Sequence, residues 1–239
     1  MLQLIQFSQY MKRPITLLRL KRRFAGGFTL VEIMTVLAIL SIVTAFATYG
    51  LSGVKSSTQL AGSCNQVANL VDLAKQTAVS KNEMTALIVI TDPTVAQRNQ
   101  VLVAYELQAT TDGSTPTAAN WKQLTSFATL PSGAVVDPSS STFTFNNSTD
   151  TSSTAGVPSP SFPTITYNGQ AVGSFKYVVF TAGGSLLSGT SATVRISPGV
   201  FPAGSSSVVY TGGTNNGVPL NYYNITILAA TGNIKIDRP

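Results

Sequence analysis

Glu32 is the residue of this sequence whose position most directly suggests a chemical task. It follows Gly26-Gly27-Phe28-Thr29-Leu30-Val31 and precedes Ile33–Val54, a run of 22 residues without a charge. A charged side chain costs about 2.5–3.5 kcal/mol at the middle of a bilayer, and less near its surface, so an acid beside such a run usually marks a partner. A second explanation is local, because the dipole of a helix favours a negative charge at the helix N-terminus.

Other residue types with catalytic or metal-binding chemistry are scarce. The chain has no histidine and a single cysteine, Cys64, which is better interpreted as a small core residue than as a reactive thiol. The acids are scattered, and neither a Gly-x-Ser-x-Gly frame nor an Asp-x-Asp calcium loop is present. We therefore expect no catalytic residue, no metal and no cofactor, and we expect a protein that is not an enzyme.

Positive charge is concentrated at the amino terminus. The 239 residues include 15 basic and 9 acidic ones, and six of the basic residues precede Gly27 with no acid among them: Lys12, Arg13, Arg19, Lys21, Arg22 and Arg23. Residues 28–239 therefore hold nine of each and are formally neutral, so the net charge of +6 does not indicate a nucleic-acid partner. Clustered positive charge beside an apolar segment is expected to stay in the cytoplasm, with the rest of the chain on the other side of the membrane.

The order of these features distinguishes the amino terminus from an ordinary secretory signal. A secretory signal places its small-residue cleavage site after the apolar core. Here the glycine pair precedes the apolar run, so cleavage at the pair would leave that run on the product. We interpret residues 1–27 as a basic leader, in which either Met1 or Met11 could be the start.

The segment from Lys21 to Glu32 resembles the class III signal of type IV prepilins and type II secretion pseudopilins. The resemblance implies that a prepilin peptidase cuts between Gly27 and Phe28 and methylates Phe28. Glu32 would then be the fifth residue of the mature chain and would pair with the amino terminus of a neighbouring subunit in a filament. It also implies a single-pass protein of the bacterial inner membrane, with its C-terminal domain in the periplasm before assembly into the filament. The implied partners are the peptidase, other pilin or pseudopilin subunits and the inner membrane.

The apolar run and the sequence after it predict one long helix with two different halves. Ile33–Val54 would be roughly 33 Å long as a helix, enough to cross a hydrocarbon core of about 30 Å, so residues 28–54 are predicted to span a membrane. Residues 55–81 continue the helix with one apolar stripe, formed by Leu60, Cys64, Val67, Val71, Ala74 and Ala78. This amphipathic half is expected to pack on a β-sheet.

After Asn82 the sequence changes to the alternation and β-branched content of strands. Residues 82–239 are predicted to form a β-rich globular domain, with a long Ser/Thr/Pro-rich loop at about 137–163. The predicted strands are Thr85–Thr91, Val101–Gln108, Trp121–Ala128, Gly133–Val136, Phe143–Phe145, Thr164–Tyr167, Lys176–Thr181, Ser191–Ile196, Ser207–Tyr210, Tyr222–Leu228 and Asn233–Ile236. The predicted fold class is α+β, pilin-like, with the second half of the helix on an antiparallel sheet.

Three segments of this domain resemble H-type minor pseudopilins and their FimT-like relatives. They are Trp121 with Leu130–Val135, Val178–Gly184 leading to Ala192–Ile196, and the hairpin Ile225–Ile236. This resemblance implies a minor subunit at or near the filament tip. A major subunit and a plain membrane-anchored β-domain remain alternatives, and secretion pseudopilus and type IV pilus are not separated.

FimT-like proteins also suggest an alternative function, since they hold DNA at a basic Gly-Arg turn. The matching turn here is Gly232-Asn233-Ile234-Lys235, which lacks the arginine. DNA binding needs several cations on one surface, and only Lys235, Arg238 and Arg195 are candidates for this role.

Overall fold

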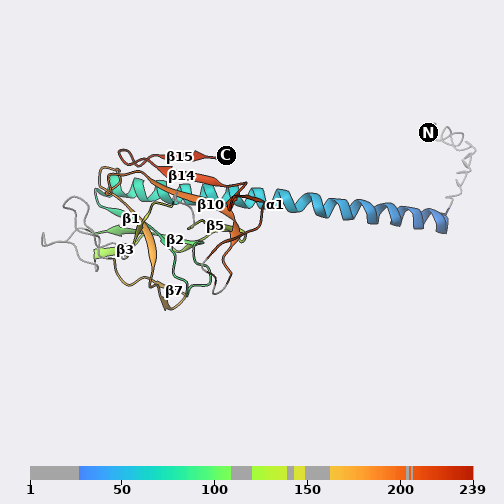
Figure 1. Cartoon of the computed structure of the whole chain (residues 1–239), viewed down its shortest axis with the longest axis horizontal. Coiled ribbons are helices and arrows are strands. Elements are labelled where there is room, and N and C mark those ends of the chain that lie inside the picture. Colours follow the sequence, from blue (N-terminus) through green and yellow to red (C-terminus); the bar gives the residue numbers. More distant parts are fainter. Residues whose placement is uncertain are drawn as a thin grey trace, which may run out of the picture. The chain divides into compact units, whose positions relative to one another are not determined.

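The computed structural model describes residues 27–108, 120–138, 143–148, 162–202, 205 and 207–238, and for residues 47–56 it describes the backbone alone. The chain divides into two compact units, Met1–Thr48 and Tyr49–Pro239. The helix α1, Leu30–Lys81, contributes residues to both units (Figure 1).

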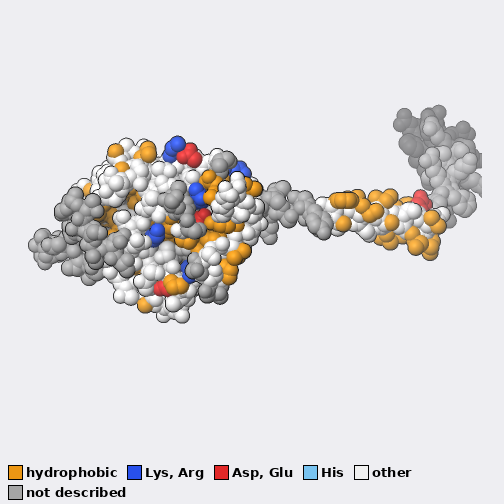
Figure 2. Space-filling view, viewed as in Figure 1, with side chains coloured by type: hydrophobic (Ala, Val, Ile, Leu, Met, Phe, Trp, Pro, Cys, Tyr) orange, Lys and Arg blue, Asp and Glu red, His pale blue; other side chains and the backbone are white. Residues whose placement is uncertain are grey.

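In the first unit, α1 is apolar on all sides. Every described side chain from residue 27 to residue 46 is exposed, including those of Leu30, Ile33, Leu37 and Leu40. Figure 2 shows hydrophobic side chains along much of the visible face of this segment. A helix that is hydrophobic all round requires an apolar environment, and the described residues of the chain itself do not supply one.

In the second unit, α1 buries the predicted stripe. Leu60, Cys64, Val67, Val71, Ala74 and Ala78 are all at most 2% exposed, which confirms the helical spacing deduced from the sequence. Ser63, which the sequence places on a polar face, is also fully buried, and its hydroxyl donates to the carbonyl of Gln59 at 2.8 Å. A hydroxyl bonded to its own helix in this way can be buried without an unsatisfied donor.

Polar contacts fix the C-terminal part of α1 on the domain. The Thr85 hydroxyl donates to the carbonyl of Ala74 at 2.7 Å, and Lys81 forms an ion pair with the buried Glu106. The Lys75 ammonium donates to the side-chain carbonyl of Asn233. These contacts attach the helix to two strands of one sheet and to the turn that precedes a strand of the other.

Two antiparallel sheets form the bulk of the domain. The first has the strand order β3-β2-β1-β9-β6, with β4 also paired to β2, and comprises β1 (Thr85–Ile90), β2 (Val101–Leu107), β3 (Trp121–Gln123), β4 (Ala128–Thr129), β6 (Asn146–Asn147) and β9 (Phe175–Phe180). The second has the order β11-β10-β14-β15, with β5 also paired to β10, and comprises β5 (Ala134–Val136), β10 (Ala192–Val200), β11 (Val209–Tyr210), β14 (Tyr223–Ile227) and β15 (Ile234–Asp237).

Two small hairpins complete the described strands. They are β7 (Thr166–Tyr167) with β8 (Gln170–Ala171), and β12 (Thr214–Asn215) with β13 (Val218–Pro219). Each turns on an Asn-Gly pair in which both residues have positive φ, as type I′ hairpins require. The predicted strand Thr164–Tyr167 contains β7, whereas no strand was predicted at β8, β12 or β13.

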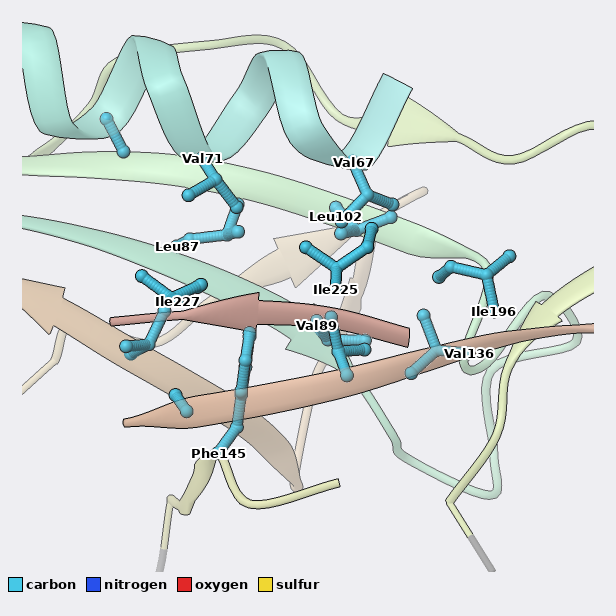
Figure 3. Close-up of a cluster of buried hydrophobic side chains, with 14 of the residues drawn as sticks. Val67, Val71, Leu87, Val89, Leu102, Val136, Phe145, Ile196, Ile225 and Ile227 are labelled. Carbon is cyan, nitrogen blue, oxygen red and sulfur yellow. The ribbon is translucent and has the colours of Figure 1, made fainter. Parts of the chain in front are cut away.

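The main core lies where α1 and the two sheets meet (Figure 3). Val67 and Val71 of the helix lie in it with Leu87, Val89 and Leu102 of the first sheet and Val136, Ile196, Ile225 and Ile227 of the second. Because the helix supplies one wall of this core, neither sheet could bury its inner face without it.

The first sheet is buried on its other face too. A second cluster contains Ile88 and Ile90 of β1, Val103 and Tyr105 of β2, and the Trp121 ring of β3. Phe162 contacts the cluster, with ring centroids 4.8 Å from Trp121 and 4.9 Å from Tyr177. This explains why β1 is buried at all six positions and does not alternate.

Several strand bounds differ from those expected. The predicted strand Trp121–Ala128 is two short strands, β3 and β4, and β10 continues past Ile196 to Val200. Pro198 lacks an amide hydrogen, yet its carbonyl accepts from the amide of Thr211 and it lies opposite Ala134 of β5, so the ladder passes through it.

The stretch expected as a long solvated loop at 137–163 is buried in part. Asp137, Phe143 and Phe145 are at most 5% exposed. The strand in this stretch is β6, Asn146–Asn147, paired with β9, and not Phe143–Phe145. The two phenylalanines pack into the main core as the chain approaches β6, and residues 139–142 and 149–161 lie outside the described part of the chain.

A buried carboxylate holds the connection between β1 and β2. Burial alone would raise the pKa of Asp92, but hydrogen bonds from the Thr94 hydroxyl and from the amides of Thr94, Gly173 and Ser174 lower this pKa below its ordinary value. A depressed folded-state pKa means that Asp92 stabilises the fold above the unfolded-state pKa of about 3.9, and that the contribution is lost as pH falls through the lower folded-state value.

We expect Asp92→Asn to destabilise the full chain by about 1–3 kcal/mol at pH 7, because the charged acceptor of several hydrogen bonds is lost. Urea unfolding in detergent at pH 7 and at pH 3 measures this, and the difference from wild type should shrink at the lower pH. Asp72→Asn, which changes an exposed acid on α1, is the control. An Asp92→Asn protein as stable as wild type at pH 7 would contradict the assignment.

The turn between β14 and β15 requires glycine. Gly232 has φ +62°, and a Cβ atom there would lie 2.1 Å from the carbonyl oxygen of Gly184. We expect Gly232→Ala to lower the free energy of unfolding by about 2–3 kcal/mol, as measured by urea unfolding. Gly169→Ala is the matched control, because Gly169 has φ +80° but open space around its Cβ position. Equal effects of the two substitutions would mean that backbone strain, and not the close approach to Gly184, sets the cost.

Candidate functional site

The predicted cleavage site lies directly before α1. Gly27, Phe28 and Thr29 have no regular secondary structure and are exposed. A Cβ atom built on Gly27 meets no atom within 4 Å, and Gly27 does not have a positive φ. Within the described residues, neither space nor backbone conformation requires glycine at position 27.

Thr29 and Glu32 form a reciprocal pair of hydrogen bonds at the start of α1. The amide of Glu32 donates to the Thr29 hydroxyl at 3.2 Å, and the amide of Thr29 donates to the Glu32 carboxylate at 3.4 Å. This is the capping box, in which Thr at the N-cap and Glu three residues later satisfy two amides that the helix leaves unpaired. The local explanation for Glu32, in which the acid stabilises the N-terminus of its own helix, is therefore supported by two specific hydrogen bonds.

The capping box leaves most of the carboxylate unused. A carboxylate can accept about four hydrogen bonds, and among the described residues the Glu32 side chain accepts the single long one from Thr29. The other polar side chains along this part of α1 are satisfied internally. The hydroxyls of Thr35, Ser41 and Thr44 donate to backbone carbonyls three or four residues earlier, at 2.7–2.9 Å. Glu32 is thus the one charged residue from 27 to 46 and the one with clear capacity for a further partner.

The three cations proposed for DNA lie in the second sheet. Arg195 is on β10 and Lys235 on β15, and Arg238 follows β15. Arg195, Asn224 and Asp237 stand in one cross-strand row, with Thr193, Thr226 and Lys235 in the next, so the two rows share a face of the sheet.

Each of these cations already has partners. Arg195 donates to the side-chain carbonyl of Asn224 at 3.1 Å and lies over the Tyr222 ring at 4.2 Å. Arg238 donates to the side-chain carbonyl of Asn221 at 3.2 Å and lies over the Tyr223 ring, and Lys235 forms an ion pair with Asp237 at 3.0 Å. The three side chains lie on or next to the second sheet, but each already has a partner, and the carboxylate of Asp237 lies beside Lys235.

Cys64 has no role in either site. It is 2% exposed in the main core, and burial raises the pKa of its thiol to about 11. Among the described residues no group of three or more His, Cys, Asp or Glu side chains could hold a metal ion.

The sequence interpretation identified Glu32 but missed Thr29. The available signal was the Thr-x-x-Glu spacing immediately before an apolar run, which is the sequence form of a capping box. The aromatic partners of Arg195 and Arg238 carry no comparable signal, because the pairing depends on strand register.

The amino-terminal segment matches a known family motif. A family model described as the prokaryotic N-terminal methylation motif matches residues 22–48. The match includes Gly27, Phe28 and Glu32, and it agrees with the resemblance that the sequence of this segment shows. In the described part of the chain, a helix packs on an antiparallel β-rich domain, which confirms the predicted fold class.

Solved structures similar to the chain include two minor subunits. The Pseudomonas aeruginosa type IV minor pilin FimU is 13% identical, with a TM-score of 0.38 over 76% of this chain and 93% of that one. The minor pseudopilin EpsH of the type 2 secretion system of Vibrio cholerae is 13% identical, with a TM-score of 0.40 over 76% of this chain and 98% of that one. A second EpsH structure gives 12% identity and a TM-score of 0.39, over 77% and 98%. No curated protein sequence matches the chain.

The membrane span stays a prediction. In the part of the chain that the structure describes, no helix is long and apolar enough to cross a membrane. The predicted span over residues 28–54 includes residues 47–54, whose side chains lie outside the described part.

Proposed function

We propose that the protein is a minor pilin or pseudopilin subunit that a prepilin peptidase processes between Gly27 and Phe28. The observation that carries this proposal is the N-terminal methylation motif over residues 22–48, with Glu32 at the first turn of α1. Residues 1–27 would be the leader, residues 28–54 the membrane and filament-core helix, residues 55–81 its continuation on the domain, and residues 82–239 the periplasmic β-rich domain. The role is structural, with no reaction catalysed by the subunit itself.

The surroundings of Gly27 support recognition by an enzyme. The described residues do not require glycine at position 27. Its presence is better explained by a protease that binds the extended chain closely there, because glycine has no side chain to obstruct the approach. Phe28 is 75% exposed directly after the bond to be cut, so the cleavage site is accessible. Methylation would then occur on the new amino group of Phe28.

Glu32 would change partner on assembly. Among the described residues of the single chain, Thr29 donates one long hydrogen bond to its carboxylate. In a filament core, the charged amino terminus of a neighbour could offer a charge-assisted hydrogen bond, which is stronger than a neutral one and gains further in an apolar medium. The pairing would neutralise the one charge in an otherwise apolar segment, and would set the axial register between subunits.

The apolar surface of the first unit supports insertion before assembly. Its exposed leucine, isoleucine and valine side chains would lie first in the inner membrane and later against the helices of other subunits. The internally bonded hydroxyls of Thr35, Ser41 and Thr44 suit either environment, because neither offers water to an unpaired donor.

Processing is tested by the intact mass and N-terminal sequence of the protein from membranes that contain a prepilin peptidase. We expect a chain that begins at methylated Phe28. In Gly27→Val the leader should be retained, because a branched side chain replaces the glycine beside the scissile bond. A wild-type chain that keeps residues before Gly27, or that is cut after the apolar run, would overturn the proposal.

The two roles of Glu32 are separated by a pair of variants. Glutamine at this position retains the capping box but not the charge, whereas valine removes both. If charge pairing matters, Glu32→Gln and Glu32→Val should both reduce incorporation into filaments by about tenfold or more, because a pairing worth about 1.4 kcal/mol changes an equilibrium tenfold. Protection of Cys64 from alkylation at pH 8 reports that the domain remains folded.

The capping role alone predicts a different pattern. Glu32→Gln would then assemble like wild type, and Thr29→Ala would be as defective as Glu32→Val. That outcome would contradict the charge-pairing role while leaving processing at Gly27 unaffected.

A further inference from the structure

The connection between β1 and β2 holds a buried arginine. Arg98 is 8% exposed, and its backbone is fixed because its amide donates to the carbonyl of Val95 at 3.1 Å. The next residue, Asn99, is 3% exposed with φ +58°, and its amide donates to the carbonyl of Ile90 at 2.7 Å. Asp92 anchors the start of the same connection. Hydrogen bonds therefore hold the backbone on both sides of Arg98.

Arg98 lacks the acceptor that the other described arginines have. Arg195 and Arg238 each lie over a tyrosine ring and donate to an asparagine carbonyl. Arg98 lies over the Phe201 ring, with its central guanidinium carbon 4.6 Å from the ring centroid, but its Nη2 is buried without a hydrogen-bond partner among the described residues. The same stacking arrangement is present, and the acceptor is absent.

This deficit carries an energetic cost. Buried charges are normally paired, because an unpaired one loses its hydration without compensation. Asn99 adds to the cost, since its side-chain oxygen is also buried without a donor in the described part of the chain. Arg98 is also the only buried basic residue among those described. An acceptor that pairs with Nη2 would recover a hydrogen bond that the described residues do not supply.

From this comparison the structure assigns a carboxylate-binding site to Arg98 and Phe201. The aromatic ring covers one face of the guanidinium, so a ligand would approach the edge in the plane of the group, and the buried Nη2 would have to become accessible to it. A carboxylate presents two coplanar oxygens that match this edge, and it supplies the negative charge that a neutral carbonyl would not. The carboxylate could come from an acidic side chain of another protein subunit or from a small free acid, and the two sources are separated below.

The first experiment uses the full chain in detergent and acetate as the probe. Thermal unfolding is measured in sodium acetate and in sodium chloride at equal ionic strength and pH 7. We expect acetate to raise the Tm of wild type by about 2–4 °C relative to chloride, through preferential binding to the folded state. The shift should be lost in Arg98→Gln, and it should be retained in Lys122→Gln, which removes an exposed cation.

Arg98→Lys provides a second variant if the glutamine protein does not fold. Lysine keeps the positive charge but not the planar pair of donors, so its acetate shift should fall to less than half that of wild type. A shift in Arg98→Lys as large as that of wild type would indicate general electrostatic attraction and would overturn the site.

The second experiment detects an acidic side chain from another subunit. A photoreactive amino acid replaces Pro202, an exposed residue next to Phe201, in cells that produce the full machinery. We expect a crosslinked product that Arg98→Gln abolishes and Lys122→Gln retains. Acetate binding without this crosslink would assign the site to a free carboxylate, whereas the crosslink would assign it to a protein partner.

Absence of both the acetate shift and the Arg98-dependent crosslink would overturn the proposal. The acetate measurement does not involve processing or assembly, so its failure is distinguishable from a failure of the proposed filament function.

Discussion

The fold of the domain depends on one face of one helix. The stripe from Leu60 to Ala78 supplies the wall against which the two sheets bury their inner faces, and valines of α1 lie among side chains of both sheets (Figure 3). Lys75 and Lys81 add polar attachments, one to the turn before β15 and one to β2. Removing this face would expose two apolar sheet surfaces at once, so the helix is an integral part of the domain and not an addition to it.

The sequence predicted the features that repeat at short range. The 4-3-4-3 spacing of the stripe is a property of a single helix, so the buried residues followed directly from it. The strands β1, β2, β9, β14 and β15 were predicted within a few residues, because each has several β-branched or aromatic residues between turn signals. Strands of two residues, such as β12 and β13, contain too little pattern to be recognised. Their positions depend on pairing, and β10 likewise passes through Pro198 because β5 and β11 lie beside it.

The candidate sites also differ in whether local spacing or the tertiary fold identifies their residues. Gly27, Phe28 and Glu32 could be named from the sequence because their spacing carries the signal, and Thr29 could have been added from the same spacing. Arg98 could not, since its aromatic partner Phe201 is distant in the sequence and its burial results from the tertiary fold. The partners of Lys235, Arg195 and Arg238 could not be predicted either, because they depend on the register of β10, β14 and β15.

The internal bonding of Thr35, Ser41 and Thr44 has a consequence for neighbours of α1. Each hydroxyl is directed to the helix's own backbone, so this stretch presents a nearly isotropic surface with few directional bonds to offer sideways. Dispersion attraction between apolar side chains does not require a particular donor and acceptor, so apolar side chains on any face of the helix can contribute to it. If helices of this kind pack side by side, as proposed above, each could rotate slightly about its axis without breaking hydrogen bonds to its neighbours. Sliding along the axis would be resisted mainly at Glu32, the one charged residue from 27 to 46.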